Sequence, residues 1–207
     1  MKKVASMLVG LAAVALLCQG CRGSSPVLGS VVQSNASVSP TAGVLPLGAA
    51  CLPSDEAQPT FSGYGLAEVT VESPAPSCAS NVCLVNHMQG RASCPYGQTV
   101  EQAATAPACF LPGSALPVTV AVEPQLVGRQ ADLVATCSCR CGGTGPGPFC
   151  ACPGGMMCVP SVEPNDALGD SVLAGSYCVL AGTTYDPSIT SPACEVSSGD
   201  CGSSRPY

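Results

Sequence analysis

The stretch Cys137-Ser138-Cys139-Arg140-Cys141, followed nine residues later by Cys150-Ala151-Cys152, decides how this chain folds. Alternate residues of an extended strand share one face, so the three sulfurs of the first run point the same way. Their Cα atoms then lie ~6.5 Å apart with parallel Cβ directions, so neighbours in the run do not readily bridge each other. Each of these cysteines therefore needs a partner elsewhere. The glycine- and proline-rich loop at 142–148 suggests a β-ribbon with bridges between its strands.

The other cysteines extend this framework over most of the chain. Of 16 cysteines, only Cys18 and Cys21 precede residue 51. An even number in an exported, loop-rich chain indicates disulfides, and each native bridge contributes ~2–4 kcal/mol. The fourteen disulfide candidates are Cys51, Cys78, Cys83, Cys94, Cys109, Cys137, Cys139, Cys141, Cys150, Cys152, Cys158, Cys178, Cys194 and Cys201.

The parity of these cysteines bears on domain organisation. Five precede the cysteine-free gap at residues 110–136 and nine follow it. Because both numbers are odd, complete pairing within the chain requires at least one bridge across the gap. The two halves are then one covalent unit. Within the gap, the composition of residues 125–132 predicts an exposed loop that trypsin would cut at Arg129.

The N-terminus carries the marks of an export signal. A basic start, Met1-Lys2-Lys3, precedes an apolar stretch at residues 4–17 and the pair Gly20-Cys21. About 14 apolar residues are too few to span a bilayer, which needs ~20. The segment resembles bacterial lipoprotein signals, although those usually have leucine three residues before the cysteine, where this chain has Cys18. The resemblance implies cleavage before Cys21 by signal peptidase II, and lipidation of Cys21 with diacylglyceryl and fatty acyl groups such as palmitate.

Composition limits the function classes. After removal of residues 1–20 the chain has no lysine, and five arginines face 13 acidic residues, a net charge of −8. Nucleic acids and anionic headgroups need a basic surface, so neither is an expected partner. The chain has no Trp, three Phe and five Tyr, with 20 Pro and 23 Gly. These numbers indicate a thin core without long helices, which disulfides would reinforce.

The expected organisation has three parts. Residues 1–20 are a lipoprotein signal peptide, and residues 21–50 are a lipidated N-terminus and flexible tether with a span of ~30 Å. An alternative is that residues 27–32 and 44–47 add edge strands to the domain. Residues 51–207 form a single disulfide-rich ectodomain. The fold class is all-β or largely irregular: a small disulfide-rich β domain after a flexible tether.

Local patterns place the elements of that domain. Residues 118–122, which are rich in β-branched side chains, are the strongest strand signal, and residues 100–106 are the one helical turn expected. Further strands are expected at 66–72, 82–85, 133–136, 157–162 and 171–180.

His87, the only histidine, is the one candidate catalytic base. No Gly-x-Ser-x-Gly elbow accompanies it, so a structural histidine near a strand end is preferred. His87 and Arg91 are also candidate ligand contacts. We assign no catalytic residue and no cofactor. A small extracytoplasmic hydrolase using His87 is kept as an alternative function.

Two binding patterns are weighed against simpler interpretations. The Cys-x-Cys runs could hold Zn²⁺ or Cu(I) as thiolates, but export favours disulfides, so we predict no metal site and keep a thiolate metal-binding protein only as an alternative. Glu163, Asn165, Asp166 and Asp170 could offer oxygen ligands to Ca²⁺, but a solvated acidic turn explains them better.

Several motifs together resemble a family. These are Cys78-x4-Cys83-Leu84-Val85-Asn86-His87, Gly90-Arg91, Cys94-Pro95-Tyr96-Gly97-Gln98, Cys139-Arg140-Cys141, Cys152-Pro153-x-Gly155 and Gly175-Ser176-Tyr177-Cys178. They look like uncharacterised cysteine-rich lipoproteins of myxobacteria, over about two-thirds of the chain.

The resemblance supports the location more than an activity. We expect a lipid-anchored cell-envelope protein, at the outer membrane, with a non-catalytic binding or structural ectodomain. The expected partners are the membrane, through the N-terminal lipid, and an envelope protein or glycan ligand.

Overall fold

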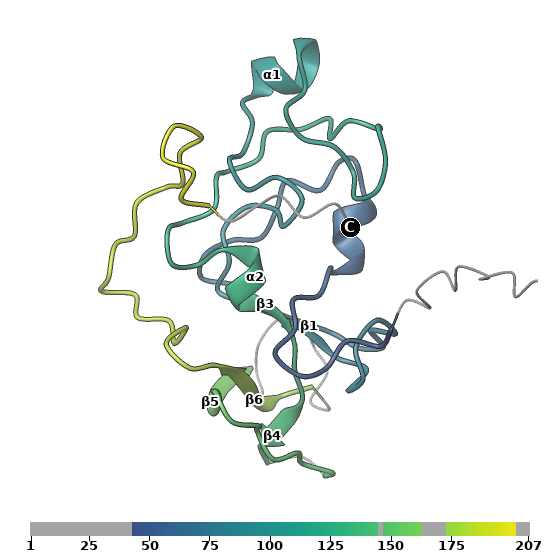
Figure 1. The fold of residues 1–207 in the computed structure, drawn as a ribbon, viewed down its shortest axis with the longest axis vertical. Coiled ribbons are helices and arrows are strands. Elements are labelled where there is room, and N and C mark those ends of the chain that lie inside the picture. Colours follow the sequence, from purple (N-terminus) through teal and green to yellow (C-terminus); the bar gives the residue numbers. More distant parts are fainter. Residues whose placement is uncertain (1–42, 145–146, 163–172, 202–207) are drawn as a thin grey trace, which may run out of the picture. The chain divides into compact units, whose positions relative to one another are not determined.

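The structure is a computed structural model that describes residues 43–144, 147–162 and 173–201. In chain order the elements are η1 (Ser54–Ala57), β1 (Val69–Glu72), β2 (Cys83–Asn86), α1 (Val100–Thr105), α2 (Ala131–Val134), β3 (Ala135–Cys137), β4 (Arg140–Gly142), β5 (Met156–Val162) and β6 (Gly175–Leu180) (Figure 1). The strands form two antiparallel three-stranded sheets, in the orders β1-β2-β3 and β4-β6-β5. The predicted fold class, a sheet-dominated domain rich in disulfides, is confirmed.

The first sheet is centred on β2, whose four residues are all buried. Leu84 lies opposite Val71 of β1 and Thr136 of β3. Leu84 and Val71 pack with Val162, Tyr177 and other apolar residues of the second sheet, so the two sheets share one cluster of apolar side chains. A strand covered on both faces reads as a continuous apolar run, which is how Cys83-Leu84-Val85 reads in the sequence.

The second sheet is centred on β6, which pairs with β5 over most of its length. The sequence predicts that the run at 137–141 pairs with the run at 150–152. This pairing is wrong, because β4 pairs with β6 instead. Residues 150–152 form no strand, although the amide of Cys150 donates to the carbonyl of Arg140. The short β4 thus gains a longer and more apolar partner than the Cys150 run offers.

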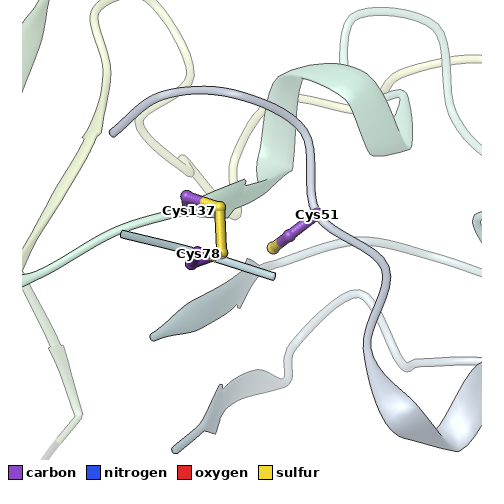
Figure 2. Close-up of side chains that lie close together, drawn as sticks. All are labelled: Cys51, Cys78 and Cys137. Carbon is purple, nitrogen blue, oxygen red and sulfur yellow. A yellow bond between two sulfur atoms is a disulfide. The ribbon is translucent and has the colours of Figure 1, made fainter. Parts of the chain in front are cut away.

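Seven disulfides link the described residues, as predicted. They join Cys51–Cys83, Cys78–Cys137, Cys94–Cys109, Cys139–Cys150, Cys141–Cys158, Cys152–Cys178 and Cys194–Cys201. No cysteine of the run at 137–141 bridges another member of that run. Cys78–Cys137 is the bridge across residues 110–136, and Figure 2 shows it beside Cys51, which is bonded to Cys83. One covalent unit follows.

The strand predicted at residues 118–122 is wrong. Only Val122 forms a bridge there, to Gln98. The Gln98 side-chain amide donates to the carbonyls of Val118 and Val120 at 2.9 and 2.7 Å. A buried side chain thus takes the place of a partner strand. The strand predicted at 133–136 begins late, because α2 occupies its first half.

The C-terminal end of the predicted tether is also wrong. Leu45 forms a parallel bridge to Cys78, and Ala50 forms an antiparallel bridge to Thr136. The amide of Gly48 donates to the carbonyl of Cys137 at 2.8 Å. Residues 45–50 therefore belong to the domain. The alternative, in which residues 44–47 pair at the edge of the domain, agrees with the bridge at Leu45. Residues 1–42 lie outside the described residues; they include the predicted signal peptide, Cys21 and most of the predicted tether. The acidic cluster at 163–170 also lies outside the described residues.

Candidate functional site

His87 is held at the end of β2 in a left-handed backbone conformation, with φ at 54°. Its Nδ1 lies 3.0 Å from the carbonyl oxygen of Leu66, to which a protonated Nδ1 donates. Its ring stacks on Tyr185, with ring centroids 4.0 Å apart. Burial lowers the pKa of His87; the Leu66 hydrogen bond opposes this shift, and the nearby positive charge of Arg129 adds to it.

Arg129 also contacts the Tyr185 ring, and its predicted exposure is wrong. The side chain is buried, and the guanidinium lies 5.3 Å from the centre of the Tyr185 ring. It donates to the carbonyls of His87 and Asn86, each at 2.6 Å. Arg129 thus connects the end of β2 at residues 86–87 with the segment at 183–185. Among the described residues, no hydroxyl or carboxylate hydrogen-bonds His87.

The prediction of Arg91 as a ligand contact does not fit the structure, because the Arg91 side chain is fully buried. Its Nε lies 3.2 Å from Oε2 of Glu56, whose side chain is also 0% exposed. The guanidinium also donates to the carbonyls of Gln58, Phe61 and Glu56. Glu56 in turn accepts from the amide of Ala92 at 2.8 Å and the hydroxyl of Ser93 at 2.7 Å. The pair therefore holds η1 against the loop at 91–93.

The sulfur atoms gather in places without offering thiolates. Among the described residues there are three groups of three cysteines whose Sγ atoms lie within 4.8 Å of one another. One group, Cys51, Cys78 and Cys137, is drawn in Figure 2. In a second group the Sγ atoms of Cys150 and Cys178 are 3.7 Å apart. Every sulfur in these groups is bonded to another in a disulfide. Because metals bind the thiolate, these oxidised sulfurs are poor ligands.

A hollow of about 430 Å³ beside α1 is the candidate binding site, and we call it the Tyr96–Phe110 cleft. Phe110 is 43% exposed, and Tyr96 is half-buried. Gln102 of α1 and the exposed Val196 also face the hollow. The full lining is Ser93, Cys94, Pro95, Tyr96, Gly97, Gln102, Ala108, Phe110 and Val196. None of these side chains carries a formal charge.

The walls of the cleft are fixed from behind. Cys94, two residues before Tyr96, and Cys109, directly before Phe110, are bonded to each other. Oε1 of the buried Gln98 accepts from the amides of Ala108 and Cys109 at 3.2 and 3.1 Å. The same side chain therefore holds residues 108–109 and 118–120 together. Gly97 has φ at 67°, and a Cβ there would lie 2.5 Å from the carbonyl oxygen of Val122, so only glycine fits this turn.

Thr99 and Gln102 fix the helix that supplies one wall. Oγ1 of Thr99 accepts from the amide of Gln102 at 3.2 Å, and Oε1 of Gln102 accepts from the amide of Thr99 at 2.8 Å. This capping box explains why residues 100–105 form the helical turn that the sequence predicts. It also fixes the Gln102 amide at the cleft while leaving its Nε2 without a partner among the described residues.

A second hollow, of about 500 Å³, lies beside Phe149. Phe149 is 44% exposed, and the guanidinium of Arg140 lies 5.2 Å from the centre of its ring. The remaining lining is mostly apolar and includes Leu47, Val82 and the bonded pair Cys139 and Cys150. Ser80 and Arg140 are its polar lining side chains, so this hollow, unlike the Tyr96–Phe110 cleft, carries a formal charge.

The motif Cys94-Pro95-Tyr96-Gly97-Gln98 is visible in the sequence, but it predicts no role for Tyr96 or Gln98. A tyrosine between proline and glycine in a turn is a signal of an exposed aromatic side chain. No such signal identifies Phe110, because its place in the cleft depends on the Cys94–Cys109 bridge.

Comparison with protein-family models, with curated proteins and with solved structures gives no match. Within the residues that the structure describes, no helix is both long and apolar enough to cross a bilayer.

Proposed function

We propose that this chain is a membrane-anchored lipoprotein of the cell envelope, whose disulfide-stabilised domain binds a ligand without catalysis at the Tyr96–Phe110 cleft. In this proposal residues 1–20 are removed, Cys21 carries the lipid, and the anchor is in the outer membrane. The basic start, the apolar stretch and Gly20-Cys21 support the anchor. The seven disulfides support an oxidising location outside the cytoplasm.

The exposure of a phenylalanine side chain at a hollow is the observation that carries the binding role. The chain has three Phe and no Trp, so large aromatic side chains are scarce. Burial of a Phe side chain stabilises a fold by ~1.5–3 kcal/mol. Yet Phe110 is 43% exposed and lines the Tyr96–Phe110 cleft. An aromatic side chain kept out of the core at a concave surface is typical of ligand contact.

The polar chemistry of the domain favours binding over a reaction. The buried charged and amide side chains Glu56, Arg91, Gln98, Gln125 and Arg129 hydrogen-bond backbone groups or one another. The cleft itself is lined by no carboxylate, imidazole or amine, the side chains that most often act as general acids or bases. The alternative hydrolase would depend on His87, which is engaged with Leu66 and Tyr185.

The anchor and the binding role are tested separately. Cys21→Ser should move the exported protein from the membrane fraction to the soluble fraction, and a substituted protein that stays with membranes would contradict lipid attachment. The soluble Cys21→Ser protein is then sedimented with isolated cell envelopes. Adding Phe110→Ala should weaken this binding at least tenfold, a change of ~1.4 kcal/mol.

Phe149→Ala is the matched control, because Phe149 has the same residue type and nearly the same exposure. Binding should survive that change. If Phe149→Ala abolishes binding and Phe110→Ala does not, the site has been placed in the wrong hollow. If envelopes never bind the Cys21→Ser protein, the binding role itself is wrong.

A further inference from the structure

We infer that the Tyr96–Phe110 cleft takes a neutral saccharide, an inference that rests on the proposed binding function and names its ligand class. The size of the cleft is the first argument. A hollow of about 430 Å³ lies in the range of small-ligand pockets, ~300–1,000 Å³. A specific protein partner needs a contact surface of ~800 Å² on each side. The concave surface therefore suits a few sugar rings better than a protein face.

Charge is the second argument. None of the nine lining residues has a formal charge, since Cys94 is bonded and the others are neutral at pH 7. An anionic ligand would find no cation in the cleft and would face a chain with an acidic excess. A cationic ligand would find no carboxylate in the lining. The ligand that fits such a site is itself uncharged.

The mixture of rings and unpaired polar groups is the third argument. A sugar ring has an apolar C–H face and a rim of hydroxyl groups. Phe110 and Tyr96 both line the cleft, and an aromatic ring has a flat apolar face with negative π density, which suits polarised C–H groups. Nε2 of Gln102 offers two N–H donors, and the Tyr96 hydroxyl both donates and accepts. Neither group has a hydrogen-bond partner among the described residues.

Preorganisation is the fourth argument, because weak sugar contacts need walls that do not have to be ordered on binding. The amide of Gln125 donates to the carbonyl of Pro95 at 2.8 Å, and the carbonyl of Gln125 accepts from the amide of Cys194 at 2.8 Å. One residue therefore ties the Tyr96 wall to the segment that carries Val196. The Cys194–Cys201 bridge closes that segment into a small loop.

An extended peptide is the rival ligand. Peptides commonly dock by adding a strand to an open sheet edge or a helix to a long groove. No residue of the cleft lining belongs to a strand of either sheet, and α1 is a six-residue helix. The cleft thus lacks the backbone edge that gives peptides their affinity.

The test uses the soluble Cys21→Ser protein and calorimetric titration with neutral trisaccharides built from glucose, galactose, mannose or N-acetylglucosamine. A galacturonic acid trimer is the anionic match in size. At least one neutral trimer should bind, and the anionic trimer should bind at least tenfold more weakly. Phe110→Ala should reduce affinity at least tenfold, and Phe149→Ala should leave it unchanged.

Gln102→Glu is a second variant that does not threaten the fold. Glutamate keeps the capping box with Thr99 but removes both N–H donors and adds a negative charge to the cleft. It should weaken neutral sugar binding while the thermal midpoint stays the same.

The inference is overturned if no neutral trimer binds, if the anionic trimer binds equally well, or if Phe110→Ala has no effect. If neutral sugars fail while envelope binding still needs Phe110, the ligand is a protein and the proposed function stands. If envelope binding also fails, the proposed function falls with the inference.

Discussion

Replacement of Arg91 by methionine is the sharpest test of how the domain is held together. The change removes every hydrogen bond of a fully buried guanidinium and leaves the carboxylate of Glu56 buried without its cation. Breaking a buried ion pair by removal of one partner costs ~3–5 kcal/mol. The carbonyls of Gln58 and Phe61 also lose their donors. We expect a loss of ~3–5 kcal/mol in the free energy of unfolding, a large part of the ~5–15 kcal/mol of an ordinary domain.

The assay is guanidinium chloride unfolding with the disulfides intact, followed by far-ultraviolet circular dichroism. Glu101→Gln is the control, because Glu101 is an exposed carboxylate and its change should cost less than ~0.5 kcal/mol. Arg91→Met with Glu56→Gln completes a double-mutant cycle, and the two losses should overlap by ~0.5–3 kcal/mol. A loss below ~1 kcal/mol for Arg91→Met would refute the placement of Arg91.

Three further outcomes are expected. The buried Tyr64 hydroxyl has no partner among the described residues, so Tyr64→Phe should raise the free energy of unfolding by ~1 kcal/mol in the same assay; a loss would reveal a missed partner. Burial lowers the pKa of His87, so its contribution to stability is complete above the unfolded pKa of 6.5 and is lost as the pH falls from that value through the lower folded pKa. His87→Asn, which tolerates the left-handed backbone, should therefore lessen the decline in thermal midpoint between pH 7.5 and 5.5, and an unchanged decline would contradict this. Alkylation of the unfolded, unreduced protein should label none of the fourteen cysteines from Cys51 onward, and labelling of two or more would revive the thiolate alternative.

The sequence predicts the disulfide framework because cysteine pairing obeys simple constraints. The spacing in Cys137-Ser138-Cys139-Arg140-Cys141 prevents pairing within the run, and the parity of the two halves requires a crossing bridge. Both expectations are confirmed, the second by Cys78–Cys137. The identity of each partner could not be predicted, since fourteen cysteines allow very many pairings that spacing alone does not distinguish.

The predictions that the structure contradicts fail because of contacts between residues far apart in sequence. Residues 118–122 have the pattern of a strand, but the Gln98 side chain binds their carbonyls from 20 and 22 positions away. Arg91 is a candidate ligand contact in the sequence, whereas the structure pairs it with Glu56 from 35 positions away. A local pattern carries no information about such partners, so tertiary hydrogen bonds override it.

The candidate site was only partly predictable for the same reason. The helical turn at Val100–Thr105 follows from its Thr99 cap and Gln102, which are local signals. Phe110 reaches the same cleft through the Cys94–Cys109 bridge, and Val196 reaches it through contacts of Gln125. The bridge spans 15 positions, and Tyr96 and Val196 lie 100 positions apart, so no local periodicity predicts that these residues meet.

Hydrogen–deuterium exchange of the Cys21→Ser protein, with and without isolated cell envelopes, tests the binding site most directly, because it requires no knowledge of the ligand. Amides at residues 93–97 and 102–110 should exchange more slowly when envelopes are present, and those around Phe149 should not change. Slower exchange around Phe149 alone, or no change anywhere in the described domain, would contradict the assignment of the Tyr96–Phe110 cleft as the binding site.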